Sequence, residues 1–194
     1  MKSGILLLLA SALMAQGPEY TADGKLIRPE NYREWIYLSS GLGMTYGERS
    51  NPDPSFDNVF VSPPAYREFI ATGHWPEKTM FILEVRAASS HGSINKGGHF
   101  QTNLIAIEAE VKDSTRFAET WAYFGFGGTP GSPGKTARAL PKGSACQTCH
   151  SKNGAVENTF VQFYPTLLET AQRHGTLKAS YEPPVPSQRT SPNH

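Results

Sequence analysis

The middle of the chain carries the alternation of apolar and polar positions that is typical of β-strands. Residues 104–111 are the clearest case, because apolar side chains occupy one face while Glu108 and Glu110 occupy the other. Residues 79–86 alternate similarly, and residues 56–61 and 121–126 form short apolar or aromatic runs. Four strands joined by short links predict an antiparallel sheet.

Helical patterns flank these strands. One predicted helix begins at Pro29 and runs through Leu38, and a second covers residues 65–71 after Ser62-Pro63-Pro64 and stops at Gly73. Residues 156–163 and 166–174 predict two more, with Pro165 between them and Gly175 as the stop. We therefore expect an α+β, β-rich fold: an antiparallel sheet flanked by a few helices.

The two ends of the chain read differently from its middle. Residues 1–15 combine Lys2, an apolar run and small residues before a polar segment, which predicts a signal peptide cleaved after Ala15 or at Ala10-Ser11-Ala12. The alternative, a membrane anchor, needs about 20 apolar residues and this run is shorter. We expect an N-terminal arm over residues 16–28, one domain over residues 29–178 and a disordered proline-rich tail over residues 179–194. The mature protein is then exported, to the periplasm where the cell has one.

Composition narrows the class of function. The 194 residues carry 18 Lys and Arg against 17 Asp and Glu, and 38% are hydrophobic. That is enough apolar material for a packed core in one domain, and no cluster of basic residues forms a stripe for nucleic acid. We expect no nucleic-acid partner and no membrane span after signal cleavage.

The only two cysteines lie in the sequence Cys146-Gln147-Thr148-Cys149-His150, a C-x-x-C-H motif. Two thiols one helical turn apart can form thioethers with the two vinyl groups of a haem, and the adjacent histidine can then bind the iron. The motif predicts one haem c, attached through Cys146 and Cys149, with iron bound by His150. Export agrees with this prediction independently.

Three other interpretations of the motif are weaker. A disulfide between these cysteines closes a tiny loop of little stabilising value. A thioredoxin-type pair belongs after a strand in a βαβ unit, whereas this motif follows the Gly- and Pro-rich segment 127–144. A zinc site needs four ligands, and adjacent Cys149 and His150 are poorly placed to bind one ion together.

The sixth iron ligand is not assigned by the sequence. No methionine follows the motif, since the four methionines are Met1, Met14, Met44 and Met80. This disfavours a plain electron carrier and predicts an open sixth position. The other candidate ligands are histidines in segments that also suit a surface or loop: His74, His91, His99 and His174. Four phenylalanines are available to cap an apolar pocket, although core packing suits them equally: Phe56, Phe60, Phe81 and Phe100.

Several segments in order resemble the cytochrome P-460 family, including the related cytochromes c-prime-beta. The matching segments are Asn31-Tyr32-Arg33-Glu34-Trp35, Val111-Lys112-Asp113-Ser114 with Arg116-Phe117, Trp121-Ala122-Tyr123-Phe124, the late C-x-x-C-H motif and Phe163-Tyr164-Pro165-Thr166-Leu167. The resemblance implies an antiparallel sheet, a homodimer and a five-coordinate haem with His150 as proximal ligand.

The same resemblance separates two reactivities. Hydroxylamine-oxidising members join a strand lysine to the haem edge, and the corresponding position here falls near Leu83, in a strand without lysine. Lys78 and Lys96 lie outside that strand, although either could reach a haem. We take Lys96 as one candidate catalytic residue and Glu157 as another, the latter for proton transfer. The residues favour binding or scavenging of nitric oxide, with carbon monoxide as a related ligand. The alternatives are oxidation of hydroxylamine or nitric oxide, and electron transfer with a periplasmic partner.

Overall fold

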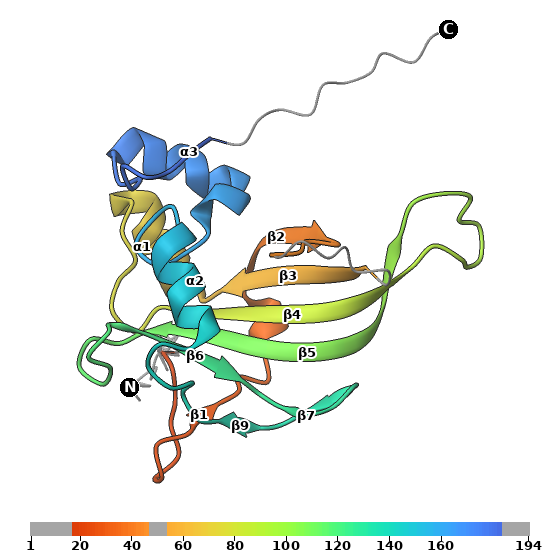
Figure 1. Cartoon of the computed structure of the whole chain (residues 1–194), viewed down its shortest axis with the longest axis horizontal. Coiled ribbons are helices and arrows are strands. Elements are labelled where there is room, and N and C mark those ends of the chain that lie inside the picture. Colours follow the sequence, from red (N-terminus) through yellow and green to blue (C-terminus); the bar gives the residue numbers. More distant parts are fainter. Residues whose placement is uncertain (1–16, 47–53, 184–194) are drawn as a thin grey trace, which may run out of the picture.

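A five-stranded antiparallel sheet forms the body of the computed structural model, which describes residues 17–46 and 54–183 (Figure 1). The strands lie side by side in the order β2-β3-β4-β5-β6. Their bounds are β2 Ile36–Leu42, β3 Ser55–Val61, β4 Met80–Ser89, β5 Phe100–Lys112 and β6 Trp121–Gly125. The predicted fold class and the four predicted strands are confirmed, and β5 begins earlier than its hydrophobic pattern suggested.

The fifth strand, β2, lies where a helix was expected, so the prediction of a helix from Pro29 to Leu38 is wrong. Only a short 3-10 helix, η1 (Tyr32–Glu34), forms there. The backbone becomes extended at Trp35 (ψ 173°), and the residues that follow form β2, which pairs with β3 with a register shift between Tyr37 and Ser39. Leu38 packs in the core. The neighbouring Tyr37 is 53% exposed, and its ring contacts the Phe60 ring. Pairing with β3 therefore overrides the local helical signals.

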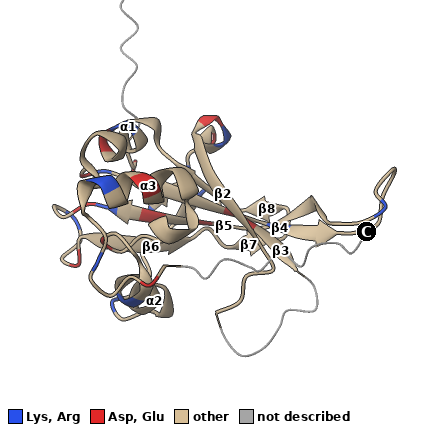
Figure 2. Cartoon of the chain, turned by 90° about the horizontal axis from the view of Figure 1, so that it is seen from above, with Lys and Arg blue, Asp and Glu red and all other residues tan. Residues whose placement is uncertain are grey.

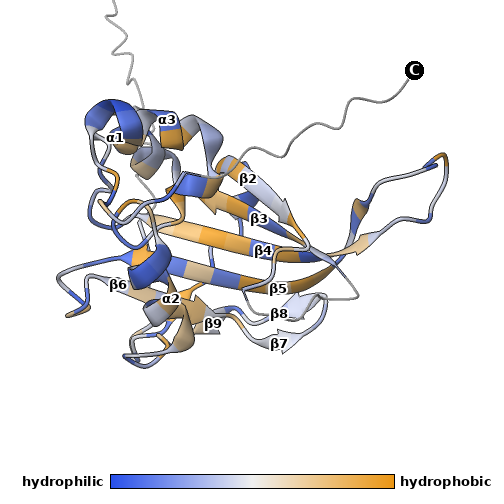
Figure 3. Ribbon diagram, turned by 45° about the horizontal axis from the view of Figure 1, so that its top comes forward, coloured by the Kyte–Doolittle hydropathy of each residue, from blue (hydrophilic) through white to orange (hydrophobic). Residues whose placement is uncertain are grey.

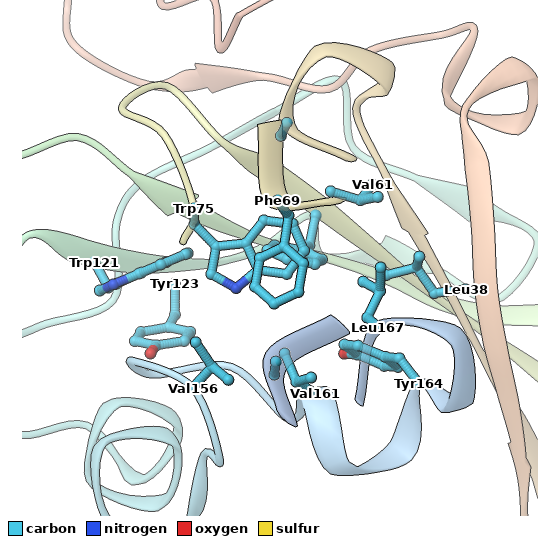
Figure 4. Close-up of a cluster of buried hydrophobic side chains, with 13 residues drawn as sticks. Leu38, Val61, Phe69, Trp75, Trp121, Tyr123, Val156, Val161, Tyr164 and Leu167 are labelled. Atoms are coloured by element: carbon cyan, nitrogen blue, oxygen red, sulfur yellow. The ribbon is translucent and has the colours of Figure 1, made fainter. Parts of the chain in front are cut away.

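Three helices lie over one end of the sheet (Figure 1). They are α1 (Pro63–Thr72), α2 (Ala145–Asn153) and α3 (Pro165–His174). One cross-strand row of the sheet faces them, made of Val61, Phe81, Glu110 and Tyr123. We call this side the helical face. Its buried cluster is drawn in Figure 4, and Trp75 stacks on Phe69 with ring centroids 4.0 Å apart.

The opposite face packs against the N-terminal segment and the strands after β6. Met80, Ile82, Ile107 and Ala109 are buried there beside Leu26, Tyr32 and Trp35. The short strands on this side are β1 (Leu26–Ile27), β9 (Thr136–Ala137), β7 (Gly128–Thr129) and β8 (Ser132–Pro133), with β1 paired to β9 and β7 to β8. Figure 3 shows apolar residues along much of β4 and polar segments among the apolar ones of β5.

One ion-pair network on this opposite face is centred on the buried side chain of Glu84. Glu84 accepts hydrogen bonds from Arg86 Nε at 2.5 Å, from Arg33 Nη2 at 2.6 Å and from the Tyr32 hydroxyl. Although burial opposes ionisation, these donors hold the pKa of Glu84 below its usual value. The network therefore ties η1 to the centre of the sheet.

Two further predictions concern the C-terminal part. The helix at residues 166–174 is confirmed as α3, with Gly175 in a left-handed conformation (φ 67°) at its end. The helix predicted at residues 156–163 is wrong. A turn bridged between Val156 and Thr159 precedes the short 3-10 helix η2 (Val161–Phe163), because Glu157 has a left-handed backbone (φ 52°) that no α-helix accommodates.

The predicted signal peptide, residues 1–15, and residues 184–194 of the predicted tail lie outside the described residues. Within residues 17–46 and 54–183, none of the helices combines the length and apolar character that a bilayer crossing requires. Basic and acidic residues are interspersed over the molecule (Figure 2).

Candidate functional site

The C-x-x-C-H motif lies within α2. Ser144 precedes the helix, and its hydroxyl accepts a hydrogen bond from the Gln147 backbone N–H at 3.4 Å. At the other end the Gly154 N–H donates to the His150 carbonyl at 2.9 Å. Cys146 and Cys149 are free, partly exposed thiols one helical turn apart. This helix therefore presents both thiols and His150 together, as the spacing predicted.

The Nδ1 edge of the His150 ring is held by a hydrogen bond. Its Nδ1 lies 2.9 Å from the Asn158 backbone carbonyl, which fixes Nδ1 as the protonated nitrogen. Within the described part of the chain, Nε2 has no hydrogen-bond partner. A histidine that donates from one nitrogen to a carbonyl has the other nitrogen oriented and basic for a metal.

Two aromatic rings enclose the imidazole. Tyr123 of β6 lies with its ring centroid 4.6 Å away, and Phe160 lies 4.4 Å away. Both contacts are tilted, and the His150 side chain is only 23% exposed. These rings restrict the rotation of the imidazole and keep its surroundings mostly apolar.

A buried carboxylate lies beside the same imidazole edge. Glu110 Oε1 of β5 is 3.4 Å from His150 Nδ1, yet this oxygen has no hydrogen bond within the described residues. Burial raises the pKa of Glu110, with His150 opposing the shift. The Tyr123 hydroxyl is also buried without a hydrogen-bond partner there. Two unsatisfied polar atoms therefore lie in the protein wall next to His150.

Beyond this wall the helical face is only partly covered. The next cross-strand row contains Val59, Leu83, Glu108 and Gly125, and the row after it contains Asp57, Val85 and Ala106. Val59, Leu83 and Val85 are half-buried rather than buried. Partial burial raises the pKa of Asp57, and the charge of Glu108 adds to this shift. This part of the face is an apolar shelf edged by two carboxyl groups.

These features fit a covalently attached haem. The two thiols are accessible and one turn apart, and a half-buried apolar shelf lies on the same face of the sheet. Nε2 of His150 has no hydrogen bond to any of the residues that the structure describes. A flat macrocycle needs such an apolar surface together with a nitrogen ligand. Among the described residues, no group of three or more His, Cys, Asp and Glu side chains is arranged to hold a metal ion.

The other lysine and acid candidates lie elsewhere. Lys96 is exposed in the β4–β5 hairpin, which extends away from the helices (Figure 1). Lys78 forms an ion pair with Asp113 and donates to Thr115 at 3.0 Å. Glu157 is in the turn after α2, where it bonds to Lys112 and the Trp75 backbone rather than to His150. Leu83 is on the shelf, where the strand alternation placed it.

The remaining candidates are also apart from α2. His91 and His99 are exposed in the β4–β5 hairpin, His74 lies 3.9 Å from Glu157, and His174 bonds to the Ile70 carbonyl. Of the four phenylalanines, only Phe81 is on the helical face, buried in the core. Phe60 packs on the opposite face, and Phe56 pairs with Arg86 near the start of β3. The Phe100 ring lies so close to Gly92 that a Cβ on this glycine would be 2.8 Å from it.

Sequence reasoning missed four residues around His150: Glu110, Tyr123, Asn158 and Phe160. The position of Glu110 could have been found from the strand pattern, because Glu110 pairs with Phe81 on one side and with Tyr123 on the other. An acid between two aromatic strand positions is buried rather than solvated. Asn158 acts through its backbone carbonyl, for which side-chain patterns give no signal.

One comparison with known proteins gives a match. The family described as Cytochrome P460 matches residues 29–161, more than half of the chain. The matched segment includes β2 to β6, α1, α2 and the whole C-x-x-C-H motif. No curated protein matches the chain.

Proposed function

The chain belongs to the cytochrome P460 family, and from this premise we propose that it is an exported mono-haem c-type cytochrome that binds nitric oxide. Family membership supports a haem-binding cytochrome in general. The observation that carries the proposal further is the free Nε2 of His150, held opposite a hydrogen-bonded Nδ1 on a helix that also presents two thiols.

Different residues would hold different parts of the cofactor. Cys146 and Cys149 would carry the thioethers, and His150 would bind the iron through Nε2. The bound haem would supply an iron with an open sixth position for a small ligand. Tyr123 and Phe160 orient the imidazole, while the shelf of Val59, Leu83 and Val85 would exclude water from a bound macrocycle.

The shelf favours a small uncharged ligand. Leu83 stands where the family's hydroxylamine-oxidising members are expected to have the cross-linking lysine, so this wall supplies no amine. Burying nitric oxide or carbon monoxide against an apolar wall carries little free-energy penalty, because these ligands are uncharged and need no hydrogen bonds. A polar ligand would lose its hydrogen bonds to water and gain none from this wall. Nitric oxide binding is therefore the primary role that these residues support.

One observation favours oxidation of hydroxylamine as a second candidate. Asp57 and Glu108 are on the same face as the shelf, and the partial burial of Asp57 raises the pKa of its carboxyl group. Carboxyl groups with raised pKa values can accept protons from a bound substrate near neutral pH. In this chain, Asp57 and Glu108 would have to accept those protons without a lysine cross-linked to the haem.

Adding nitric oxide and hydroxylamine separately to the purified holoprotein distinguishes the two candidates. We expect the ferrous protein to bind nitric oxide and carbon monoxide, and hydroxylamine to be turned over poorly with a dye as electron acceptor. Rapid hydroxylamine turnover would reject nitric oxide binding as the primary role. A protein that binds neither gas and only transfers electrons would support the carrier instead.

We also infer export and pairing into a homodimer, together with an electron-transfer partner in the exported compartment. The N-terminal pattern of residues 1–15 supports export, and the family supports the homodimer. The mass of the mature chain tests export, and the mass of the native assembly tests the homodimer.

A further inference from the structure

Glu157 occupies the turn between α2 and η2 in a conformation that needs support. Its backbone is left-handed (φ 52°), a conformation that is unfavourable for a residue with a Cβ. The Thr159 N–H closes the turn by donating to the Val156 carbonyl at 2.9 Å. The contacts around the turn must therefore stabilise it.

The Glu157 carboxylate accepts two hydrogen bonds that hold the turn. Lys112 Nζ donates to Oε2 at 2.8 Å, and the Trp75 backbone N–H donates to Oε1 at 3.2 Å. Lys112 also donates to the Trp75 carbonyl at 2.7 Å. The side chains of Lys112 and Glu157 are 15% and 22% exposed, so this ion pair is shielded from water more than a surface pair.

The rest of the turn is fixed independently. The Trp75 indole N–H donates to Thr159 Oγ1 at 2.9 Å, and that hydroxyl donates to the Val156 carbonyl at 2.8 Å. Trp75 itself is buried in the cluster of Figure 4. The residues on both sides of Asn158 are thus bonded to the end of β5 and to Trp75.

Asn158 lies between these two held residues. Its carbonyl accepts from His150 Nδ1 at 2.9 Å, so the position of that carbonyl sets the strength of the hydrogen bond. A stronger bond at Nδ1 makes Nε2 a more basic ligand for a metal. The ion pair and the imidazole are therefore linked through two consecutive residues of the turn.

We propose that Lys112 and Glu157 are positioning residues for His150: their ion pair holds the turn that presents the Asn158 carbonyl to Nδ1. This inference rests on the proposed function, in which His150 binds haem iron. It replaces proton transfer as the role of Glu157.

Resonance Raman spectra of the ferrous holoprotein test the proposal, because the iron–histidine stretching frequency falls when the Nδ1 hydrogen bond weakens. Glu157→Asn removes the ion pair while keeping a residue that tolerates the left-handed backbone. Lys112→Met removes the cation and keeps the apolar stem. Both variants should show a lower stretching frequency and a higher reduction potential, and Lys112→Arg should restore the wild-type values.

The matched control is Asp23→Asn, which breaks an exposed carboxylate's pairs with Lys25 and Arg138 far from α2. It should change neither quantity. If Glu157→Asn and Lys112→Met bind haem with the wild-type frequency and potential, the proposal is wrong. A wild-type holoprotein without any iron–histidine mode would instead reject the proposed function, and this inference with it.

Discussion

Glu110 Oε1 lies 3.4 Å from Nδ1 of His150, but the Nδ1 proton is directed at the Asn158 carbonyl, and the carboxylate oxygen has no hydrogen bond within the described residues. A buried acid without full hydrogen bonding lowers the stability of a fold. Its place beside the proposed iron ligand suggests that it serves the cofactor rather than the fold.

The first prediction concerns this acid. Glu110→Leu should raise the free energy of unfolding of the haem-free protein by about 1 kcal/mol, because it removes a buried, poorly bonded polar group. The same change should alter the iron–histidine stretching frequency of the holoprotein. Thermal unfolding and resonance Raman spectra measure the two effects. A large loss of stability would show that Glu110 is a structural residue.

The second prediction concerns pH and the network around Glu84. Because the pKa of Glu84 is lowered in the folded state, its contribution to stability is complete above the ordinary value of 4.5 and is lost as pH falls through the lowered folded pKa. Glu84→Gln should cost about 2 kcal/mol at neutral pH, since two arginines lose their buried acceptor.

Unfolding midpoints of the wild type and Glu84→Gln, followed from pH 7 downward, check this sign. The gap between the two proteins should narrow in acid. A gap that stays constant or widens would contradict the assignment of Glu84 as an ionised partner of Arg33 and Arg86.

The third prediction concerns Gly154, which ends α2. A Cβ at this position would lie 2.8 Å from the His150 carbonyl oxygen and from two backbone atoms of residues 158 and 159. Gly154→Ala should therefore displace the turn and cost about 2 kcal/mol of stability. Gly97→Ala is the matched control, because nothing lies within 4 Å of a Cβ there. Equal stability of the two variants would refute the close packing of α2 on the turn.

The central sheet could be predicted from the sequence because its strands carry their own alternation. Phe81 and Leu83 face the helices while Met80 and Ile82 face the other core, as their spacing indicated. The C-x-x-C-H motif is equally local, so the grouping of its two thiols with His150 could be predicted, although no helix was expected over residues 145–153.

The errors fall where distant partners decide the structure. Residues 36–42 form β2 because β3 provides backbone hydrogen bonds along one edge of the sheet. The pattern of residues 36–42 alone does not show that this edge is available. The turn at Glu157 depends on Lys112 and Trp75, which lie far away in sequence. The wall around His150 combines β5, β6 and this turn, so it becomes visible only when the chain is folded.

The most direct test of the account is the mass of the purified mature protein, expressed in a host that attaches haem to exported cytochromes and measured after denaturation. We predict polypeptide plus one haem for the wild type, and bare polypeptide when Cys146 and Cys149 are both replaced by serine. A colourless wild-type protein with the mass of the polypeptide alone would contradict the assignment of α2 as a haem-attachment helix.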